Sequence, residues 1–184
     1  MPKNPKKPRA YAFIDSQNLN LGVQKMGWKM DWRKFRQYLQ HEYNVEKAYM
    51  FIGYVADNIA MYEQLHDMGY LIVLKRTLEV KAQEGEKTDD GEPQKPTVKG
   101  NIDAELVLWA MKELPNYDKA IIVSGDGDFF ALVEYLEQKQ KLLHLMVPNW
   151  QYSSLLKEYE KYTVRIDKLR RQLSYHDRRF KKNT

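Results

Sequence analysis

Five short runs of mostly apolar residues recur along this 184-residue chain, at residues 11–14, 47–54, 71–74, 120–123 and 142–147. A strand that is apolar throughout, rather than at alternate positions, is usually buried on both faces of its sheet. Strands of this kind occur in parallel sheets whose connections are helices. The chain is therefore predicted to form an α/β fold, with a central, mainly parallel five-stranded sheet covered by helices on both faces.

Segments between these runs carry apolar residues at helical spacing, as expected for the connections of a parallel sheet. Helices are predicted over residues 18–26, 102–113, 129–138 and 153–159, and Asp31 is placed to cap another. A further helix contains Ile59, Tyr62, Leu65 and Met68. These elements predict one domain over residues 10–160. It is preceded by a disordered basic arm (1–9) and followed by a basic helical or frayed tail (161–184).

Residues 83–97 interrupt this alternation. They include five acidic residues and no aromatic or aliphatic one, so they have nothing to bury. We therefore expect a mobile acidic loop over residues 83–98.

The net charge of +5 is distributed unevenly. Residues 1–9 contain four basic residues and no acidic one, whereas residues 10–164 contain 18 basic and 23 acidic residues. Residues 165–184 contain eight basic residues and two acidic ones. Basic segments attract nucleic acid through its phosphates, although charged tails also serve solubility alone. The candidate nucleic-acid contacts are Lys99, Arg165, Lys168, Arg170, Arg171, Arg178 and Arg179.

Several classes of protein are excluded by composition. The chain has no cysteine, which excludes a disulfide scaffold, thiolate zinc sites and cysteine-ligated iron–sulfur clusters. No apolar run approaches the roughly 18–20 residues that span a bilayer, so no membrane partner is expected. Neither a dinucleotide-binding glycine motif nor a Walker A loop is present. A cytoplasmic protein is the default expectation.

Acidic side chains gather where predicted strands end and helices begin. Asp15 follows the first apolar run, Asp126 and Asp128 follow the fourth, and Asp103 stands near a helix start. Any one of them alone is well explained as a helix cap or a first-turn acid. Together, at the carboxyl edge of one sheet, they would repel each other unless a cation lay among them. The pattern predicts a hard divalent cation, Mg²⁺ or Mn²⁺, with Asn18 and Ser124 as polar neighbours.

The order of these residues is similar to that of a known family. Phe13-Ile-Asp15-x-x-Asn18, Lys99-Gly-Asn-Ile-Asp103 and Ser124-Gly-Asp-Gly-Asp128-Phe129 resemble the motifs of the NYN domain family, in the LabA/DUF88 branch of the PIN-like nucleases. The resemblance covers residues 10–160. It implies a three-layer α/β/α, PIN-like fold. It also implies a Mg²⁺-dependent ribonuclease site with Asp15, Asp103 and Asp126 as metal ligands, completed by Asp128.

In one respect the chain departs from that family pattern. Many members carry another aspartate after the last strand, whereas residues 153–158 here read SSLLKE. The acidic ligand set is therefore expected to consist of the four aspartates already named.

The function expected from these observations is hydrolysis of RNA phosphodiester bonds, with Asn18 and Ser124 contacting a phosphate oxygen or a metal-bound water. DNA is an alternative substrate, because no residue pattern here reads a 2′-hydroxyl. Two other classes stay open. One is an RNA-binding module that does not cleave. The other is a regulatory interaction protein, with a homodimer formed through the stripe of Ile166, Leu169 and Leu173.

Overall fold

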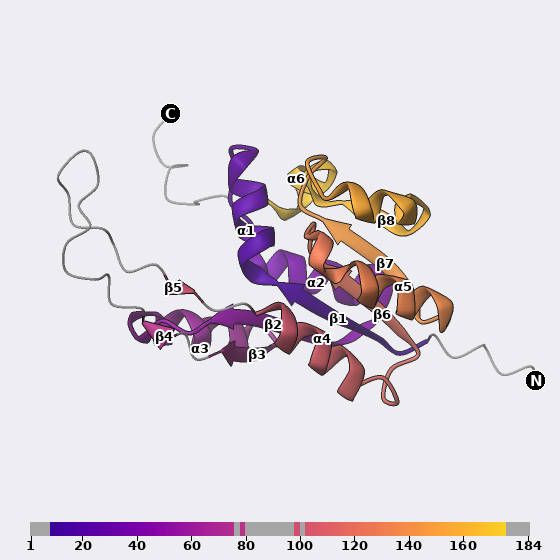
Figure 1. Ribbon diagram of the computed structural model, residues 1–184. Helices are drawn as coiled ribbons and strands as arrows, with labels where there is room; N and C mark the ends of the chain where they lie inside the picture. Colours follow the sequence, from indigo (N-terminus) through magenta and orange to yellow (C-terminus); the bar gives the residue numbers. More distant parts are fainter. Residues whose placement is uncertain (1–7, 76–77, 80–97, 100–101, 176–184) are drawn as a thin grey trace, which may run out of the picture.

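The computed structural model describes residues 8–75, 78–79, 98–99 and 102–175 (Figure 1). Its central sheet has six strands, in the spatial order β3-β2-β1-β6-β7-β8, and every neighbouring pair is parallel. The strands are β1 (Ala10–Asp15), β2 (Val45–Gly53), β3 (Tyr70–Lys75), β6 (Lys119–Val123), β7 (Leu142–Val147) and β8 (Thr163–Arg165). The predicted parallel α/β fold is confirmed.

The order of the strands reverses beside β1. From β1 the chain continues outward through β2 and β3 on one side, while β6, β7 and β8 follow one another on the other side. In open parallel sheets this reversal leaves a crevice at the carboxyl ends of the two central strands. The topology therefore places the crevice where β1 and β6 end.

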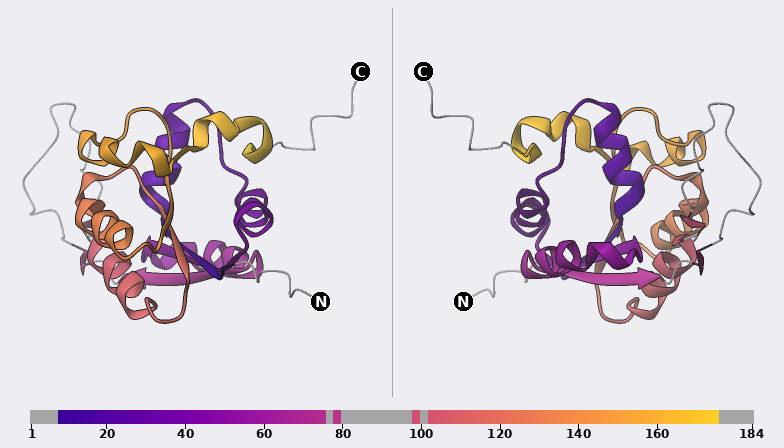
Figure 2. Two further views of the ribbon diagram at one scale, coloured as in Figure 1. Left: turned by 90° about the vertical axis from the view of Figure 1, so that its right-hand side faces the viewer. Right: turned by 90° about the vertical axis from the view of Figure 1, so that its left-hand side faces the viewer.

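Helices cover both faces of the sheet, which gives three layers (Figure 2). One face is packed by α1 (Ser16–Lys25), α2 (Trp32–Tyr43), α3 (Ile59–Asp67) and the short α6 (Arg170–Leu173). The other is packed by α4 (Asp103–Lys112), α5 (Phe130–Gln138) and the 3-10 helix η3 (Ser154–Tyr162). Shorter 3-10 turns are η1 (Ala56–Asn58), η2 (Gly127–Phe129) and η4 (Ile166–Leu169).

Strand β1 shows why the apolar runs are continuous. Ala12 and Ile14 pack into the core beneath α1 and α2, whereas Tyr11 and Phe13 pack into the core beneath α4 and α5. All four side chains are buried, so both faces of the strand are covered by helices and its run of apolar residues is continuous.

The structure differs from the sequence prediction near the carboxyl end of the described chain. The sheet has six strands rather than five, because residues 163–165 form the edge strand β8 beside β7. The helix expected over residues 153–159 is the 3-10 helix η3, with a kink at Tyr159. Beyond it, Ile166 and Leu173 are fully buried against the core, and Leu169 packs beside them. The stripe from which a dimer was expected is thus used within the chain itself.

Other expectations concern residues that the structure does not describe. Most of the arm at residues 1–9, nearly all of the loop at 83–98 and residues 176–184 lie outside the described part of the chain. Residues Leu78–Glu79 (β4) and Val98–Lys99 (β5) pair as a separate antiparallel ribbon.

Strand β7 contains a half-buried histidine that predicts a pH dependence of stability. His144 lies against the ring of Tyr43, with a centroid separation of 4.6 Å, and its Nδ1 is 3.2 Å from the carbonyl oxygen of Tyr162. Burial lowers the pKa of His144 below its ordinary value of 6.5, and the hydrogen bond to Tyr162 opposes this shift. Since the unfolded chain then binds the proton more readily, the free energy of unfolding should fall as pH drops from 6.5 toward the folded-state pKa.

The variant His144→Phe keeps a ring against Tyr43 and should flatten that pH dependence. Urea denaturation at several pH values, from about 5 to 7, measures it. His66→Gln is the matched control, because it removes a histidine whose side chain is 72% exposed. An unchanged slope in His144→Phe would assign the pH dependence to other groups.

Candidate metal centre

The loops that follow β1 and β6 are joined by side-chain hydrogen bonds at the carboxyl edge of the sheet. Asp15 ends β1 and caps α1, because its Oδ1 accepts the backbone N–H of Asn18 at 3.0 Å. Ser124 follows β6, and its hydroxyl donates to Asp15 Oδ2 at 3.1 Å. One buried hydroxyl thus joins strand ends that are 109 residues apart in sequence.

The segment after β6 is held in a tight series of turns. The backbone N–H of Asp126 donates to Ser124 Oγ at 3.1 Å, and the N–H of Asp128 donates to Asp126 Oδ1 at 3.0 Å. The N–H of Gly125 donates to the side-chain oxygen of Asn18 at 2.9 Å. These bonds fix the backbone that carries both aspartates, and they come from residue types that favour turns and caps.

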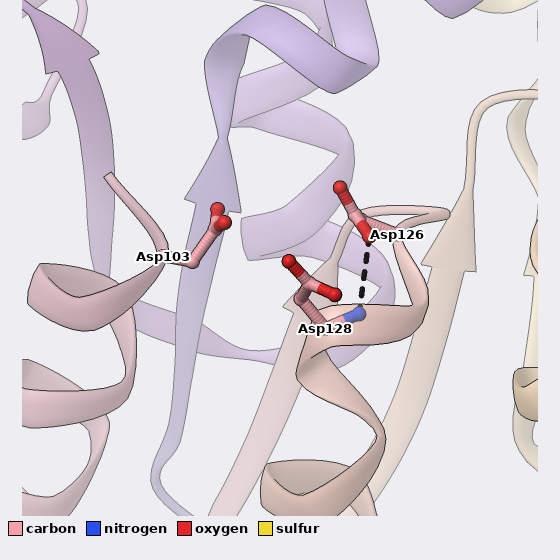
Figure 3. Close-up of side chains that lie close together, drawn as sticks. All are labelled: Asp103, Asp126 and Asp128. Carbon is pink, nitrogen blue, oxygen red and sulfur yellow. Dashed lines mark hydrogen bonds between the residues drawn. The ribbon is translucent and has the colours of Figure 1, made fainter. Parts of the chain in front are cut away.

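Three carboxylates meet in this region (Figure 3). Asp103, the first residue of α4, offers one oxygen, and Asp126 and Asp128 offer one each. These three oxygens all lie within 4.8 Å of one another. Oxygen ligands of a hard divalent cation each lie roughly 2.0–2.6 Å from the ion, so this spacing suits a shared cation. The residues present therefore fit Mg²⁺ or Mn²⁺.

Asp15 lines a cavity together with Asp103 and Asp126, but its carboxylate is not part of the close group of three. The cavity has a volume of about 330 Å³ and is lined by Asp15, Gln17, Asn18, Leu21, Ile102, Asp103 and Asp126. Asp15 is 7% exposed. Burial raises the pKa of its carboxyl, the Asn18 N–H and the Ser124 hydroxyl oppose that rise, and the charge of Asp126 adds to it. An ionised Asp15 is therefore costly unless positive charge enters the cavity.

The two polar neighbours predicted from the sequence have different positions. Asn18 lines the cavity and holds the Gly125 backbone. Ser124 is fully buried, and both of its hydrogen bonds join parts of the protein. Its hydroxyl therefore positions Asp15 and Asp126 and does not reach a substrate.

The candidate nucleic-acid contacts are only partly described. Lys168, Arg170 and Arg171 are exposed on η4 and α6, and Arg170 donates to the carbonyl of Gly27 just beyond α1, at 3.4 Å. Arg165 instead donates from Nε to Asp167 at 3.1 Å. Lys99 is in β5 but its side chain is not described, and Arg178 and Arg179 lie outside the described residues.

Sequence reasoning identified Asn18 on helix α1 but missed two other residues of this helix that line the site. Gln17 and Leu21 line the carboxylate cavity, and a Cβ at Gly22 would lie 2.3 Å from Cβ of Pro148, in the loop after β7. A signal in the sequence was Leu21, a leucine that lies off the apolar face of Leu19 and Val23, and the structure leaves it half exposed.

The fold and the site define a three-layer α/β protein with carboxylates gathered where the central parallel strands end. A family model described as the NYN domain matches residues 9–167. The chain is also 30% identical over 136 residues to the low amplitude and bright protein LabA of Synechococcus elongatus, covering 72% of this chain and 69% of that protein. The chain therefore belongs to the NYN domain family.

A solved structure supports the fold alone. It is the crystal structure of a protein of unknown function from Vibrio parahaemolyticus, which is 23% identical and has a TM-score of 0.66. The similarity covers 90% of this chain and 96% of the other. Within the described residues, no helix combines the length and the apolar character needed to cross a membrane.

Proposed function

We propose that this protein is a metal-dependent ribonuclease that hydrolyses RNA phosphodiester bonds with Mg²⁺ or Mn²⁺ held by its aspartates. The observation that carries the proposal is the convergence of Asp103, Asp126 and Asp128 within 4.8 Å at the reversal of strand order. Membership of the NYN domain family supports it, because this family is part of the PIN-like nucleases.

In this proposal the three close aspartates hold the cation, which when bound supplies Lewis-acid activation of water and stabilises charge on the phosphate oxygens. Asp15 adds negative charge at the buried side of the cavity and thereby favours cation entry. Ser124 fixes Asp15 relative to Asp126, and Asn18 fixes the loop at Gly125. Such supporting hydrogen bonds set the direction of ligand oxygens.

Incubation of the purified protein with labelled single-stranded RNA tests the proposal. Cleavage is expected with Mg²⁺ or Mn²⁺ and should disappear in EDTA or in the Asp126→Asn variant. Labelled DNA of the same sequence tests the choice of RNA. Cleavage that survives both EDTA and the substitution would show a contaminating nuclease or another mechanism. RNA that is bound but never cleaved would favour the binding module.

The exposed basic residues near α6 are proposed to attract the RNA backbone. Arg170 lies beside Gly27, at the end of α1 opposite its Asp15 cap, and a 10-residue helix is about 15 Å long. An RNA strand with one phosphate at the acidic cavity would thus reach these basic side chains within a few nucleotides. Removal of residues 165–184 is a poor test of this idea, because Ile166 and Leu173 are buried in the core.

The double variant Lys168→Gln/Arg171→Gln tests the basic surface without removing a buried residue. It should weaken RNA binding. It should also reduce the magnitude of the slope of log K, where K is the binding constant, against log[salt] by about 1.4, since each phosphate contact on single strands contributes about 0.7. Fluorescence anisotropy at several salt concentrations measures both quantities. Lys112→Gln/Lys139→Gln removes two exposed charges from the opposite layer and should leave the slope unchanged. Equal slopes in the two double variants would refute the role of α6.

A further inference from the structure

A second cavity adjoins the carboxylate cavity across helix α1. It has a volume of about 340 Å³, within the range of small-molecule sites. The two cavities share Gln17, Leu21 and Ile102 as lining residues. A ligand group placed in one is therefore an immediate neighbour of a group placed in the other.

The wall of this second cavity is apolar over most of its extent. Met50, Ile52, Met61 and Leu65 line it, together with the half-buried indole of Trp32. The Trp32 ring is held by edge contacts with Phe35 and Tyr70, each at a centroid distance of 6.4 Å. An aromatic ring that is already fixed in place loses little entropy when a planar ligand stacks on it.

Polar groups line the same cavity along the N-terminal half of α1. The Ser16 hydroxyl donates to the carbonyl oxygen of Phe51 at 2.8 Å and is committed to it. The side-chain amides of Gln17 and Asn20 also line the cavity, and neither forms a hydrogen bond within the described part of the chain. An amide offers both a donor and an acceptor, which is the pairing that the edge of a nucleobase requires.

The charges of the neighbouring cavities favour a base over a phosphate here. Among the described residues, no charged side chain lines the apolar cavity. A third cavity, of about 170 Å³, lies beyond Asn18 and Leu21 and includes Lys25 and Gln151. The carboxylate cavity thus has an uncharged, apolar neighbour on one side and a polar neighbour with a cation on the other.

We propose that the apolar cavity is a nucleobase subsite, which receives one unpaired base of single-stranded RNA next to the phosphodiester at the aspartates. This assignment rests on the proposed function for its substrate, and it adds that the enzyme holds a base and not only the sugar–phosphate backbone. The base stacks against Trp32 and presents its polar edge to Gln17 and Asn20. Base-paired RNA is a poor ligand, because its bases are not free to enter.

The test compares a single-stranded RNA of about six nucleotides with an abasic oligonucleotide of equal length and charge. Binding is measured by anisotropy in Mg²⁺, with Asp126→Asn in every protein to prevent cleavage. The blocking variant is Met61→Trp, on α3, where Met61 is 41% exposed and lines the cavity. Its matched control is Met111→Trp, where Met111 is 36% exposed on α4 and lines none of the cavities described above. Thermal melting confirms that both variants fold.

The base-containing RNA is expected to bind about tenfold more tightly than the abasic one. Met61→Trp should remove most of this preference while leaving the affinity for the abasic oligonucleotide unchanged, and Met111→Trp should retain the preference. Equal preferences in the two variants, or no preference in either, would overturn the subsite. An apolar dye that binds the unsubstituted cavity but not Met61→Trp, with RNA binding equal in both proteins, would show that the cavity takes a different ligand. That result would overturn the subsite as well.

The outcomes also separate this subsite from the proposed nuclease activity, which is measured on the unsubstituted protein. RNA that is cleaved without any base preference in binding would refute the subsite and leave the nuclease intact. A Met61-dependent base preference without cleavage under any metal condition would refute the nuclease and leave the subsite intact.

Discussion

Substitution of Asp15 by asparagine is expected to lower metal-dependent RNA cleavage by about 100-fold without destabilising the metal-free fold. The loss of activity follows from the position of Asp15 on the cavity that also contains Asp103 and Asp126. A neutral amide there no longer attracts a cation. Asparagine keeps the side-chain oxygen that accepts the Asn18 N–H, so the cap of α1 is preserved.

Although Asp15→Asn should lower activity, it should leave the stability of the metal-free protein unchanged or raise it. Asp15 is 7% exposed, and both burial and the charge of Asp126 raise the pKa of its carboxyl. In EDTA an ionised Asp15 therefore opposes folding, and the Asp15→Asn variant should melt at the same temperature or higher. In Mg²⁺ the unsubstituted protein should gain more stability than the variant, because cation binding favours the folded state.

Thermal melting in EDTA and in Mg²⁺, with cleavage rates beside it, measures these two effects. Asp67→Asn is the control, because the Asp67 side chain is 79% exposed on α3 and should change neither quantity. A clear fall in melting temperature for Asp15→Asn in EDTA would contradict this expectation, because it would show that the carboxylate stabilises the metal-free fold.

The second large effect is expected from Gly22→Ala, which should destabilise the protein by about 1–3 kcal/mol. Helix propensity alone predicts the reverse, because alanine is favoured over glycine in a helix interior by about 1 kcal/mol. In the structure, however, an added Cβ would lie 2.3 Å from Cβ and 2.8 Å from Cγ of Pro148. Asn149 also donates to the carbonyl of Gly22 at 2.8 Å, so this loop cannot move away freely.

Urea or thermal denaturation measures this effect, and the melting temperature should fall by about 2–12 °C for a chain of this size. Gln24→Ala, on the exposed side of the same helix, should be neutral or slightly stabilising. The rate of RNA cleavage should fall as well, because α1 contains Asn18 and has Asp15 as its N-cap. A stabilised Gly22→Ala variant would show that the contact with Pro148 relaxes readily.

The aspartates at the site could be predicted because each follows a simple local signal. Asp15 ends one buried apolar run and Asp126 follows shortly after another, and parallel strands bring their carboxyl ends to one edge. Asp103 begins a helix whose apolar spacing is evident. Strand β8 had no such signal, because it has three residues, none fully buried, at the edge of the sheet. Propensity and periodicity carry little information at that length.

The features that could not be predicted depend on contacts between distant segments. Nothing in the sequence around Gly22 indicates that Pro148 packs against it. Ile166 and Leu173 read equally well as a surface stripe or as core residues until the helices beside them are placed. The cavity lined by Trp32 and Met61 likewise arises from elements whose relative positions no local pattern specifies.

The hydrogen bond between Ser124 and Asp15 also concerns the order in which the chain is made. Asp15 leaves the ribosome 109 residues before its partner, and β6 must be inserted beside β1 before the two can meet. A nascent chain that still lacks β6 holds Asp15 without Ser124, Asp126 or Asp128. Under the proposed function, cleavage can therefore begin only after β6 and the turn that follows it have been synthesised and inserted beside β1.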